Sequence, residues 1–197
     1  MIICIIGPSG SGKSTRVLNY LKNHKDKANI IISDTTRPKR AGEEDGREYN
    51  FLTLKEFKKR EHIETIIYNN HSYGIPKEEL EKKLKEAPVS FVICDAEGYR
   101  LLLSRYGHNY VKSIFMRIPS SICIYNLFKR EKDADKVKRR VFYDCSIDAY
   151  TMDDMINFDR IINYSGTYQE LDETFEKYVQ ELYEEYLEQI KEYRQNL

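Results

Sequence analysis

The sequence contains no apolar stretch long enough to cross a bilayer. Its first apolar run, residues 2–6, is too short for a secretion signal and has no basic segment before it. We therefore expect a core strand at this position, and a soluble, cytoplasmic protein.

Net charge is also absent, because 32 basic residues balance 32 acidic ones. No overall field would draw the chain onto nucleic acid or an anionic membrane, and we expect neither as a partner. Any affinity for phosphate must come from a local arrangement of residues.

Cysteine is scarce, and none of the four cysteines has the spacing of a zinc site. Cys4 and Cys94 lie inside apolar runs, which indicates buried thiols in a reducing compartment. The sequence also has no internal repeat and no low-complexity linker. Its 197 residues suffice for one domain with small inserted lobes.

Residues 7–15, GPSGSGKST, match the phosphate-binding pattern G-x-x-x-x-G-K-[ST] at every fixed position. They follow an apolar run and precede a helix-forming segment, so backbone N–H groups and a helix dipole would surround one anion. Lys13 can reach the β- and γ-phosphates of a nucleoside triphosphate, and Ser14 can ligate Mg²⁺. A chance glycine turn is the alternative, and the order of elements around the pattern argues against it.

The apolar patterns predict an α/β fold around a parallel sheet, because the run at 89–94 is continuously apolar, as in a strand covered on both faces. Strands are expected at 2–6, 29–32, 89–94, 111–118 and 158–163. Helices are expected at 15–24, 53–60 and 77–86, from Ser120 with Ile124, Leu127 and Phe128 facing the core, and from Thr167 onward. Pro76 fits the first turn of the helix at 77–86, and the charged end of the last helix, residues 184–197, is expected to fray.

Three polar segments have two interpretations each. Arg37 and Arg40, on a loop stiffened by Pro38, can converge on one phosphate or lie on an ordinary solvated loop. Asp95, at the end of a strand, can orient Mg²⁺-bound water or a sugar hydroxyl, or simply cap the next helix. The charge run 129–140 is either a solvated face or a functional segment.

Several motifs together resemble the guanylate kinase family. The order TTRPKR at 35–40, GE at 42–43 and DGREYNF at 45–51 follows that family in residue type and spacing. Glu64, then Tyr73 with Gly74, and ICDAEG at 93–98 continue the resemblance. It extends from Met1 to about residue 179 and is weakest between residues 143 and 158.

The resemblance implies a P-loop three-layer fold that consists of a parallel-sheet core, an inserted monophosphate-binding lobe and a mobile lid. Within a single domain, the core would comprise residues 1–33, 89–125 and 157–197, the lobe 34–88, and the lid about 126–145. It also implies a nucleoside monophosphate kinase that transfers the γ-phosphoryl of ATP to GMP or dGMP with Mg²⁺, as a monomer or homodimer.

The site residues that the resemblance implies fall into three groups. The ATP site would consist of Gly7, Pro8, Ser9, Gly10, Ser11, Gly12, Lys13, Ser14 and Thr15, with Ser14 on the metal. The GMP site would consist of Ser33, Arg37, Arg40, Tyr49, Glu64, Tyr73, Asp95 and Gly98. Catalysis would involve Lys13, Arg37, Arg130 and Arg140, with Arg139 as a competitor for the position of Arg140.

Two departures from the family pattern bear on function. Ile75 stands where the family has a hydroxyl residue that contacts guanine, and an unpaired base edge costs about 1 to 3 kcal/mol. Glu131 and Lys132 replace the usual Gly-Thr after the first lid arginine. A kinase of the same fold for another monophosphate or a phosphorylated sugar is therefore a second hypothesis. A third is a non-catalytic binding module, although such modules typically lose the phosphate loop.

Overall fold

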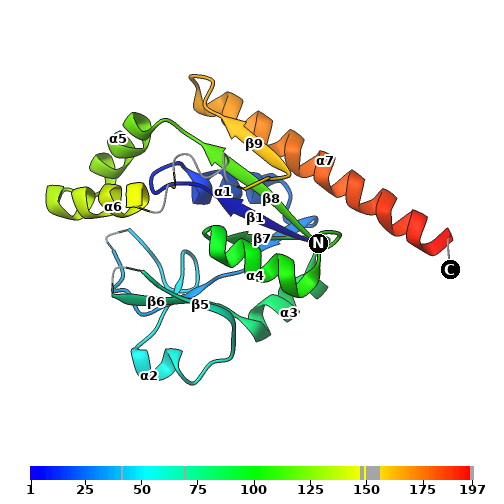
Figure 1. Cartoon of the computed structure of the whole chain (residues 1–197), viewed down its shortest axis with the longest axis horizontal. Coiled ribbons are helices and arrows are strands. Elements are labelled where there is room, and N and C mark those ends of the chain that lie inside the picture. The colour runs from blue at the N-terminus through cyan, green and yellow to red at the C-terminus, as the bar shows by residue number, and fades with distance from the viewer. Residues whose placement is uncertain (41, 69, 147–148, 150–155, 196–197) are drawn as a thin grey trace.

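The computed structural model describes residues 1–40, 42–68, 70–146, 149 and 156–195 (Figure 1). Its centre is a five-stranded parallel sheet with helices on both faces, which confirms the predicted fold class. The strands, in spatial order, are β2 (Ala28–Ile30), β7 (Val89–Ile93), β1 (Ile2–Ile6), β8 (Val111–Arg117) and β9 (Arg160–Asn163). The covering helices are α1 (Lys13–Asn23), α3 (Lys77–Glu86), α4 (Ala96–Tyr106) and α7 (Tyr168–Gln195).

Alternate side chains of β1 pack into the two layers of the core. Ile3 and Ile5 contact one apolar cluster, which α1 and α7 complete, whereas Ile2, Cys4 and Ile6 contact the other, which α3 and α4 complete. All five are buried, and burying one large aliphatic side chain contributes about 1.5 to 3 kcal/mol. Because all five strands are parallel, their carboxyl ends share one edge, where open α/β sheets bind ligands.

A second, mixed sheet of four strands lies below the core in the view of Figure 1. Its order is β4 (Asn50–Phe51), β3 (Asp34–Thr35), β6 (His71–Pro76) and β5 (His62–Tyr68), and the short helix α2 (Leu54–Phe57) accompanies it. The fully buried carboxylate of Asp34 ties the strands together. It accepts from Asn50 Nδ2 at 2.8 Å and Arg60 Nη1 at 2.9 Å, and lies 3.0 Å from His62 Nε2.

Two further helices, α5 (Ser120–Arg130) and α6 (Ala134–Ser146), lie beside the carboxyl edge of the core sheet (Figure 1). Phe128 was expected in the core, but it is 46% exposed. Leu127 is buried as expected, together with Cys123, and these two residues are four apart and share one helix face.

The start of α3 and the ends of two other elements differ from the sequence expectation. Pro76 is the N-cap of α3 and does not lie in its first turn. The helix expected at 53–60 has the predicted capping box between Thr53 and Glu56, but it ends at residue 57. The strand expected at 29–32 is β2, which ends at residue 30, although Ile31 N still donates to Phe91 O at 2.9 Å.

The last helix does not fray where its charged sequence begins, and continues through residue 195. Packing explains this continuation, because the Tyr186 ring lies edge-on to Tyr110 with centroids 5.6 Å apart. Arg160 on β9 also pairs with Glu185. Residues 196–197 of the expected core segment lie outside the described residues.

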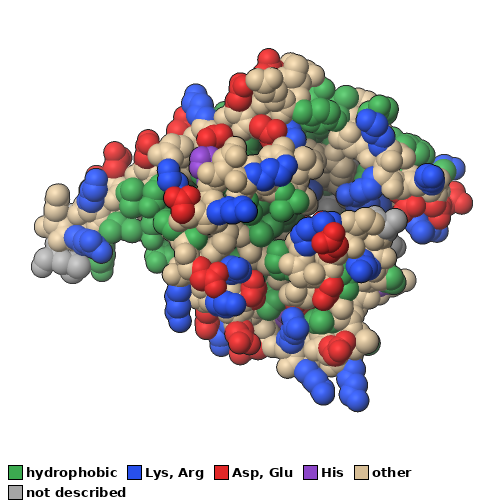
Figure 2. Space-filling view, turned by 180° about the vertical axis from the view of Figure 1, so that it is seen from behind, with side chains coloured by type: hydrophobic (Ala, Val, Ile, Leu, Met, Phe, Trp, Pro, Cys, Tyr) green, Lys and Arg blue, Asp and Glu red, His purple; other side chains and the backbone are tan. Residues whose placement is uncertain are grey.

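Acidic and basic side chains are interspersed over the face shown in Figure 2. Within the described residues, no helix has both the length and the apolar character needed to span a membrane.

Candidate active site

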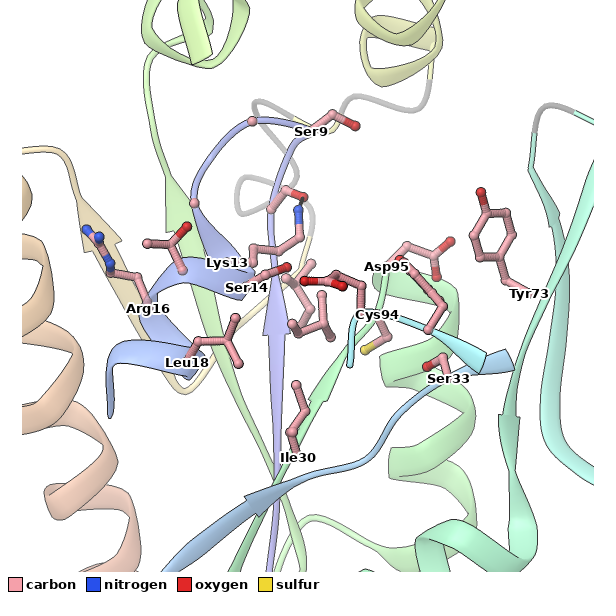
Figure 3. A pocket seen from close by; sticks show the side chains of 18 of the residues that line it. Ser9, Lys13, Ser14, Arg16, Leu18, Ile30, Ser33, Tyr73, Cys94 and Asp95 are labelled. Atoms are coloured by element: carbon pink, nitrogen blue, oxygen red, sulfur yellow. Dashed lines mark hydrogen bonds between the residues drawn. The ribbon is translucent and has the colours of Figure 1, made fainter. Parts of the chain in front are cut away.

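A cavity of about 900 Å³ lies at the carboxyl edge of the core sheet, between the two sheets and the helices α5 and α6. The loop 7–15 forms one end of it, and side chains of the mixed sheet form the other. Figure 3 shows Lys13 and Ser14 on the loop side, Tyr73 on the opposite side, and Asp95 between them. The strand ends therefore bring together segments that are distant in the sequence.

The loop keeps its shape through close contact with α5. Gly10 has a φ of +83°, and a Cβ at this position would lie 2.4 Å from the carbonyl oxygen of Cys123. Asn126 Nδ2 also donates to Gly10 O at 2.9 Å. A side chain at residue 10 would thus be strained and would push the loop away from α5.

Lys13 is the first residue of α1 and turns back over the loop. Its Nζ donates to Gly7 O at 2.6 Å and to Pro8 O at 2.9 Å. Burial lowers the pKa of Lys13 to about 8, while the charge of Asp144 opposes this shift. The ammonium group therefore lies at the centre of the loop, where an anion would favour its charged form.

At the other end of the cavity, Glu43 organises the two arginines. Arg37 is 7% exposed and donates from Nη1 to Glu43 Oε2 at 2.8 Å and from Nη2 to Oε1 at 3.0 Å. Arg40 N donates to Glu43 Oε2 at 2.8 Å. The Arg37 guanidinium also lies over the rings of Tyr49 and Phe51, at 5.4 and 5.3 Å from their centroids. Both arginines are thus held beside the cavity.

Arg40 lies in a strongly positive environment. Burial first, and then the charges of Arg140 and Arg37, lower the pKa of Arg40 to about 10. Guanidinium groups that repel one another at the edge of a cavity are stabilised by an anion placed between them. The arginine end can therefore hold a highly charged ligand such as a phosphate.

Glu64 on β5 is the buried acid of this end. Its side chain is 7% exposed, and its Oε2 has no hydrogen-bond partner among the described residues. Burial, together with the nearby charges of Asp95 and Glu97, raises the pKa of Glu64 to about 7. A Cβ on Gly98 would lie 2.5 Å from Oε2, so only glycine leaves room for this carboxylate.

Arg130 at the end of α5 and Arg140 on α6 both line the cavity. Arg139 is exposed and does not line it, so the geometry favours Arg140 over its neighbour. Arg140 Nε is buried and has no hydrogen-bond partner among the described residues. The charge run 129–140 is therefore more than a solvated face, because two of its arginines point into the cavity.

The chain was compared with known protein families, and the family model described as "Guanylate kinase" matches residues 1–188. The chain belongs to the guanylate kinase family. Guanylate kinase of Mycoplasma genitalium is 36% identical over 146 residues, which cover 71% of this chain and 60% of that protein. Guanylate kinase of Helicobacter pylori strain ATCC 700392 / 26695 is 39% identical over 109 residues, or 53% of this chain. The chain spans about half the length of the latter relative, 52%.

A crystal structure of guanylate kinase from Anaplasma phagocytophilum has the same fold. Its TM-score to this chain is 0.61, with 22% sequence identity, and the match covers 91% of this chain and 84% of that one. The structural similarity therefore extends over most of both chains.

Most residues that the sequence implicated lie on this one cavity. The predicted residues that line it are Gly7, Ser9, Gly10, Gly12, Lys13, Ser14, Thr15, Ser33, Arg37, Arg40, Tyr49, Glu64, Tyr73, Asp95, Arg130 and Arg140. Pro8, Ser11 and Gly98 do not line it. Ser11 is buried, and Gly98 lies behind Glu64. Ile75, the departure from the family pattern, lines the cavity and is 2% exposed.

Asp95 caps a helix and also lines the cavity. Its Oδ1 accepts from Gly98 N at 2.9 Å and caps α4, as the simpler interpretation proposed. It also lines the cavity and contributes to the raised pKa of Glu64. The cap thus fixes a negative charge next to the buried acid.

Sequence reasoning missed Glu43 and Asp144. Glu43 was named only within the motif GE at 42–43 and was given no role, and its contacts with Arg37 and Arg40 come from the folded loop. Asp144 lies on α6, is 4% exposed, and accepts from Ser9 N at 2.8 Å. No local pattern marks Asp144, because its partner is 135 residues away.

Proposed function

We propose that the chain is a nucleoside monophosphate kinase that transfers the γ-phosphoryl group of ATP to GMP or dGMP, giving ADP and GDP or dGDP. The observation that carries this proposal is a cavity with a phosphate-binding loop at one end and an arginine pair and a buried acid at the other. Membership of the guanylate kinase family supports it. We infer a domain made of a core (1–33, 89–125 and 157–197), a monophosphate lobe (34–88) and a lid (about 126–145).

ATP would bind with its phosphates on the loop 7–15. The glycine-rich backbone presents N–H groups, and Lys13 supplies a positive charge. Burial lowers the pKa of Lys13, and a bound anion would raise it again. Pro8 and Ser11 belong to the same loop pattern, and we include them in this site as residues that support the shape of the loop.

Mg²⁺ fits the donor chemistry at this position. Mg²⁺ prefers oxygen ligands and usually takes few of them from protein, with phosphates and water completing the octahedron. The Ser14 hydroxyl lines the cavity and would hold the ion. When bound, the ion would neutralise charge on the β- and γ-phosphate oxygens.

GMP would bind at the opposite end. Arg37, Arg40 and the hydroxyls of Tyr49 and Tyr73 would hold its phosphate. The Glu64 carboxylate would accept from the two N–H donors on the guanine edge. The remaining predicted contacts would come from Ser33, Asp95 and Gly98.

In the reaction, an oxygen of the GMP phosphate would form a bond to the γ-phosphorus while the bond from that phosphorus to the β–γ bridging oxygen breaks, so that ADP leaves. Charge spreads over the transferred group, and the protein contributes alignment and positive charge. Lys13, Arg37, Arg130 and Arg140 would supply that charge. Arg130 and Arg140, on α5 and α6, would also exclude water from the γ-phosphate.

A coupled assay of ADP release tests the proposal with a panel of monophosphates that includes GMP, dGMP, AMP, CMP and UMP. We expect turnover with GMP and dGMP, a loss of at least about a hundredfold in kcat/KM for Lys13→Ala, and no change for Lys82→Ala on exposed α3. Absence of turnover with both guanine nucleotides would overturn the assignment of the acceptor. An unaffected Lys13→Ala variant would overturn the catalytic role of the loop. Size-exclusion chromatography would distinguish a monomer from a homodimer, the two states that the resemblance leaves open.

A further inference from the structure

A carboxylate of α6 is bonded to the phosphate-binding loop. Asp144 Oδ2 accepts from Ser9 N at 2.8 Å, and Asp144 Oδ1 accepts from the Ser9 hydroxyl at 3.3 Å. Asp144 is 4% exposed, and both residues line the cavity. A negative side chain of the protein therefore occupies a backbone N–H of the loop that binds the phosphates.

The surroundings of this carboxylate are those of a bound anion. The charges of Lys13 and Arg140 both favour the ionised form of Asp144, and the hydrogen bonds from Ser9 act in the same direction. Burial opposes them and raises the pKa of Asp144. A carboxylate that accepts from a loop amide, near the positive charges of a lysine and an arginine, has surroundings of the same type as a phosphate oxygen.

Asp144 and Arg140 are four residues apart, so they lie one above the other on the same face of α6. Arg140 lines the cavity as well. A movement of α6 that takes Asp144 away from Ser9 would therefore move Arg140 with it. A second hydrogen bond joins α5 to the phosphate-binding loop, from Asn126 Nδ2 to Gly10 O. Both groups are neutral, so this bond is compatible with a bound anion.

We propose that Asp144 is an internal competitor of the ATP phosphates, which sets the affinity for the phosphoryl donor and holds α6 on the loop until the donor binds. A triphosphate near Ser9 would repel the carboxylate and take over its N–H donor, because two anions in contact repel each other strongly in a partly buried site. Its departure would release α6, and with it Arg140, to reposition beside the transferred group. This inference rests on the proposed function, since it assumes that a nucleoside triphosphate occupies the loop.

The substitution Asp144→Asn tests the charge alone. Asparagine has nearly the same shape and retains an oxygen that can accept from Ser9 N, but it does not repel phosphate. Since one charge-assisted hydrogen bond is worth about tenfold or more in an equilibrium constant, we expect Asp144→Asn to bind the ATP analogue AMP-PNP with Mg²⁺ about tenfold more tightly than the unmodified chain. Asp135→Asn is the matched control, because Asp135 lies on the same helix with an exposed side chain paired to Lys138.

Isothermal titration calorimetry of the full chain without GMP gives these affinities. Tighter binding by Asp144→Asn and unchanged binding by Asp135→Asn would support the inference. Equal or weaker binding by Asp144→Asn would overturn it while leaving the proposed function intact. If the unmodified chain itself does not bind AMP-PNP, the proposed function and this inference fall together.

Steady-state kinetics separate this role from a merely structural one. We expect the KM for ATP to fall about tenfold in Asp144→Asn while the KM for GMP stays unchanged, because only the donor competes with the carboxylate. A parallel change in both constants would indicate a general loosening of the site and would overturn the inference.

A measurement on the unmodified chain keeps the inference testable if Asp144→Asn does not fold. In a crystal structure with AMP-PNP and Mg²⁺ bound, we expect the Asp144 carboxylate to lie beyond hydrogen-bond distance of Ser9 N. A carboxylate that still accepts from Ser9 N beside the bound triphosphate would overturn the inference.

Discussion

Glu43 Oε2 accepts from Arg37 Nη1 at 2.8 Å while Oε1 accepts from Nη2 at 3.0 Å, so one carboxylate fixes the plane of the guanidinium. The same carboxylate accepts from Arg40 N at 2.8 Å. Glu43, which also lines the cavity, thus fixes the Arg37 guanidinium and the backbone at Arg40. Arg37, Arg40 and Glu43 therefore act together as one structural unit.

The substitution Glu43→Gln should weaken the acceptor site. A glutamine is neutral and has an NH2 donor in place of one carboxylate oxygen, so it cannot give each guanidinium nitrogen its own acceptor. Arg37 then loses its fixed plane, at a cost of about 1.5 to 3 kcal/mol for a hydrogen bond to a charged group. We expect the KM for GMP to rise about tenfold or more and the KM for ATP to stay the same. Steady-state kinetics check this, with the exposed neighbour substitution Glu44→Gln as control. Equal effects of the two substitutions would contradict the assignment.

The pKa of Glu64 predicts how acceptor use depends on pH. Burial raises this pKa to about 7, so Glu64 becomes protonated as the pH falls below that value and can no longer accept from two guanine donors. We expect kcat/KM for GMP to fall about tenfold per pH unit below 7, since this ratio reports ionisation of the free enzyme. Profiles from pH 5.5 to 8.5 check it.

The variant Glu64→Gln controls for the titration of GMP itself, whose phosphate has a pKa near 6. Any pH dependence that this variant retains belongs to the nucleotide or to other residues. If both proteins give the same profile, Glu64 does not recognise the base in its ionised form.

The same shift carries a cost in stability. Because the folded pKa of Glu64 is raised above its ordinary value of 4.5, the folded state binds more protons than the unfolded one between pH 4.5 and 7, and stability falls as the pH rises through that window. The lost free energy of unfolding is about 3 kcal/mol above pH 7. We expect Glu64→Gln to be more stable than the unmodified chain at pH 8 and little changed at pH 4.5. Urea unfolding at both pH values checks this, with exposed Glu81→Gln as control.

The phosphate loop and the arginine pair were predictable because the residues that form each of them are close together in the sequence. A strand, a glycine turn, Lys13 and a helix follow one another directly, and Arg37 and Arg40 lie within one short loop. The parallel core was predictable for a similar reason, since strands such as β1 and β7 are apolar throughout.

The mixed sheet and the carboxylate contacts were not predictable in this way. The strands β3 and β4 are two residues long, which is too short for any periodic signal, and they are held by the buried carboxylate of Asp34. Asp144 meets Ser9 only because α6 folds back onto the loop. The apolar spacing of α5 placed Leu127 in the core correctly but misplaced Phe128, which is exposed.

Ile75 offers a test of base selectivity by addition of one hydroxyl. It lines the cavity at 2% exposure, on β6 two residues after Tyr73, and its side chain cannot form a hydrogen bond to a base. Threonine at this position supplies a hydroxyl, and valine has the same shape as threonine without it, so Ile75→Val is the matched control for the lost methyl group.

A hydroxyl that pairs with the carbonyl of guanine should raise the ratio of kcat/KM for GMP over AMP about tenfold in Ile75→Thr relative to Ile75→Val. The buried hydroxyl costs about 1 to 3 kcal/mol of stability when unpaired, so the gain in thermal stability on adding GMP should also be larger for threonine. Equal selectivity of the two variants would mean that residue 75 packs against the base without facing its polar edge.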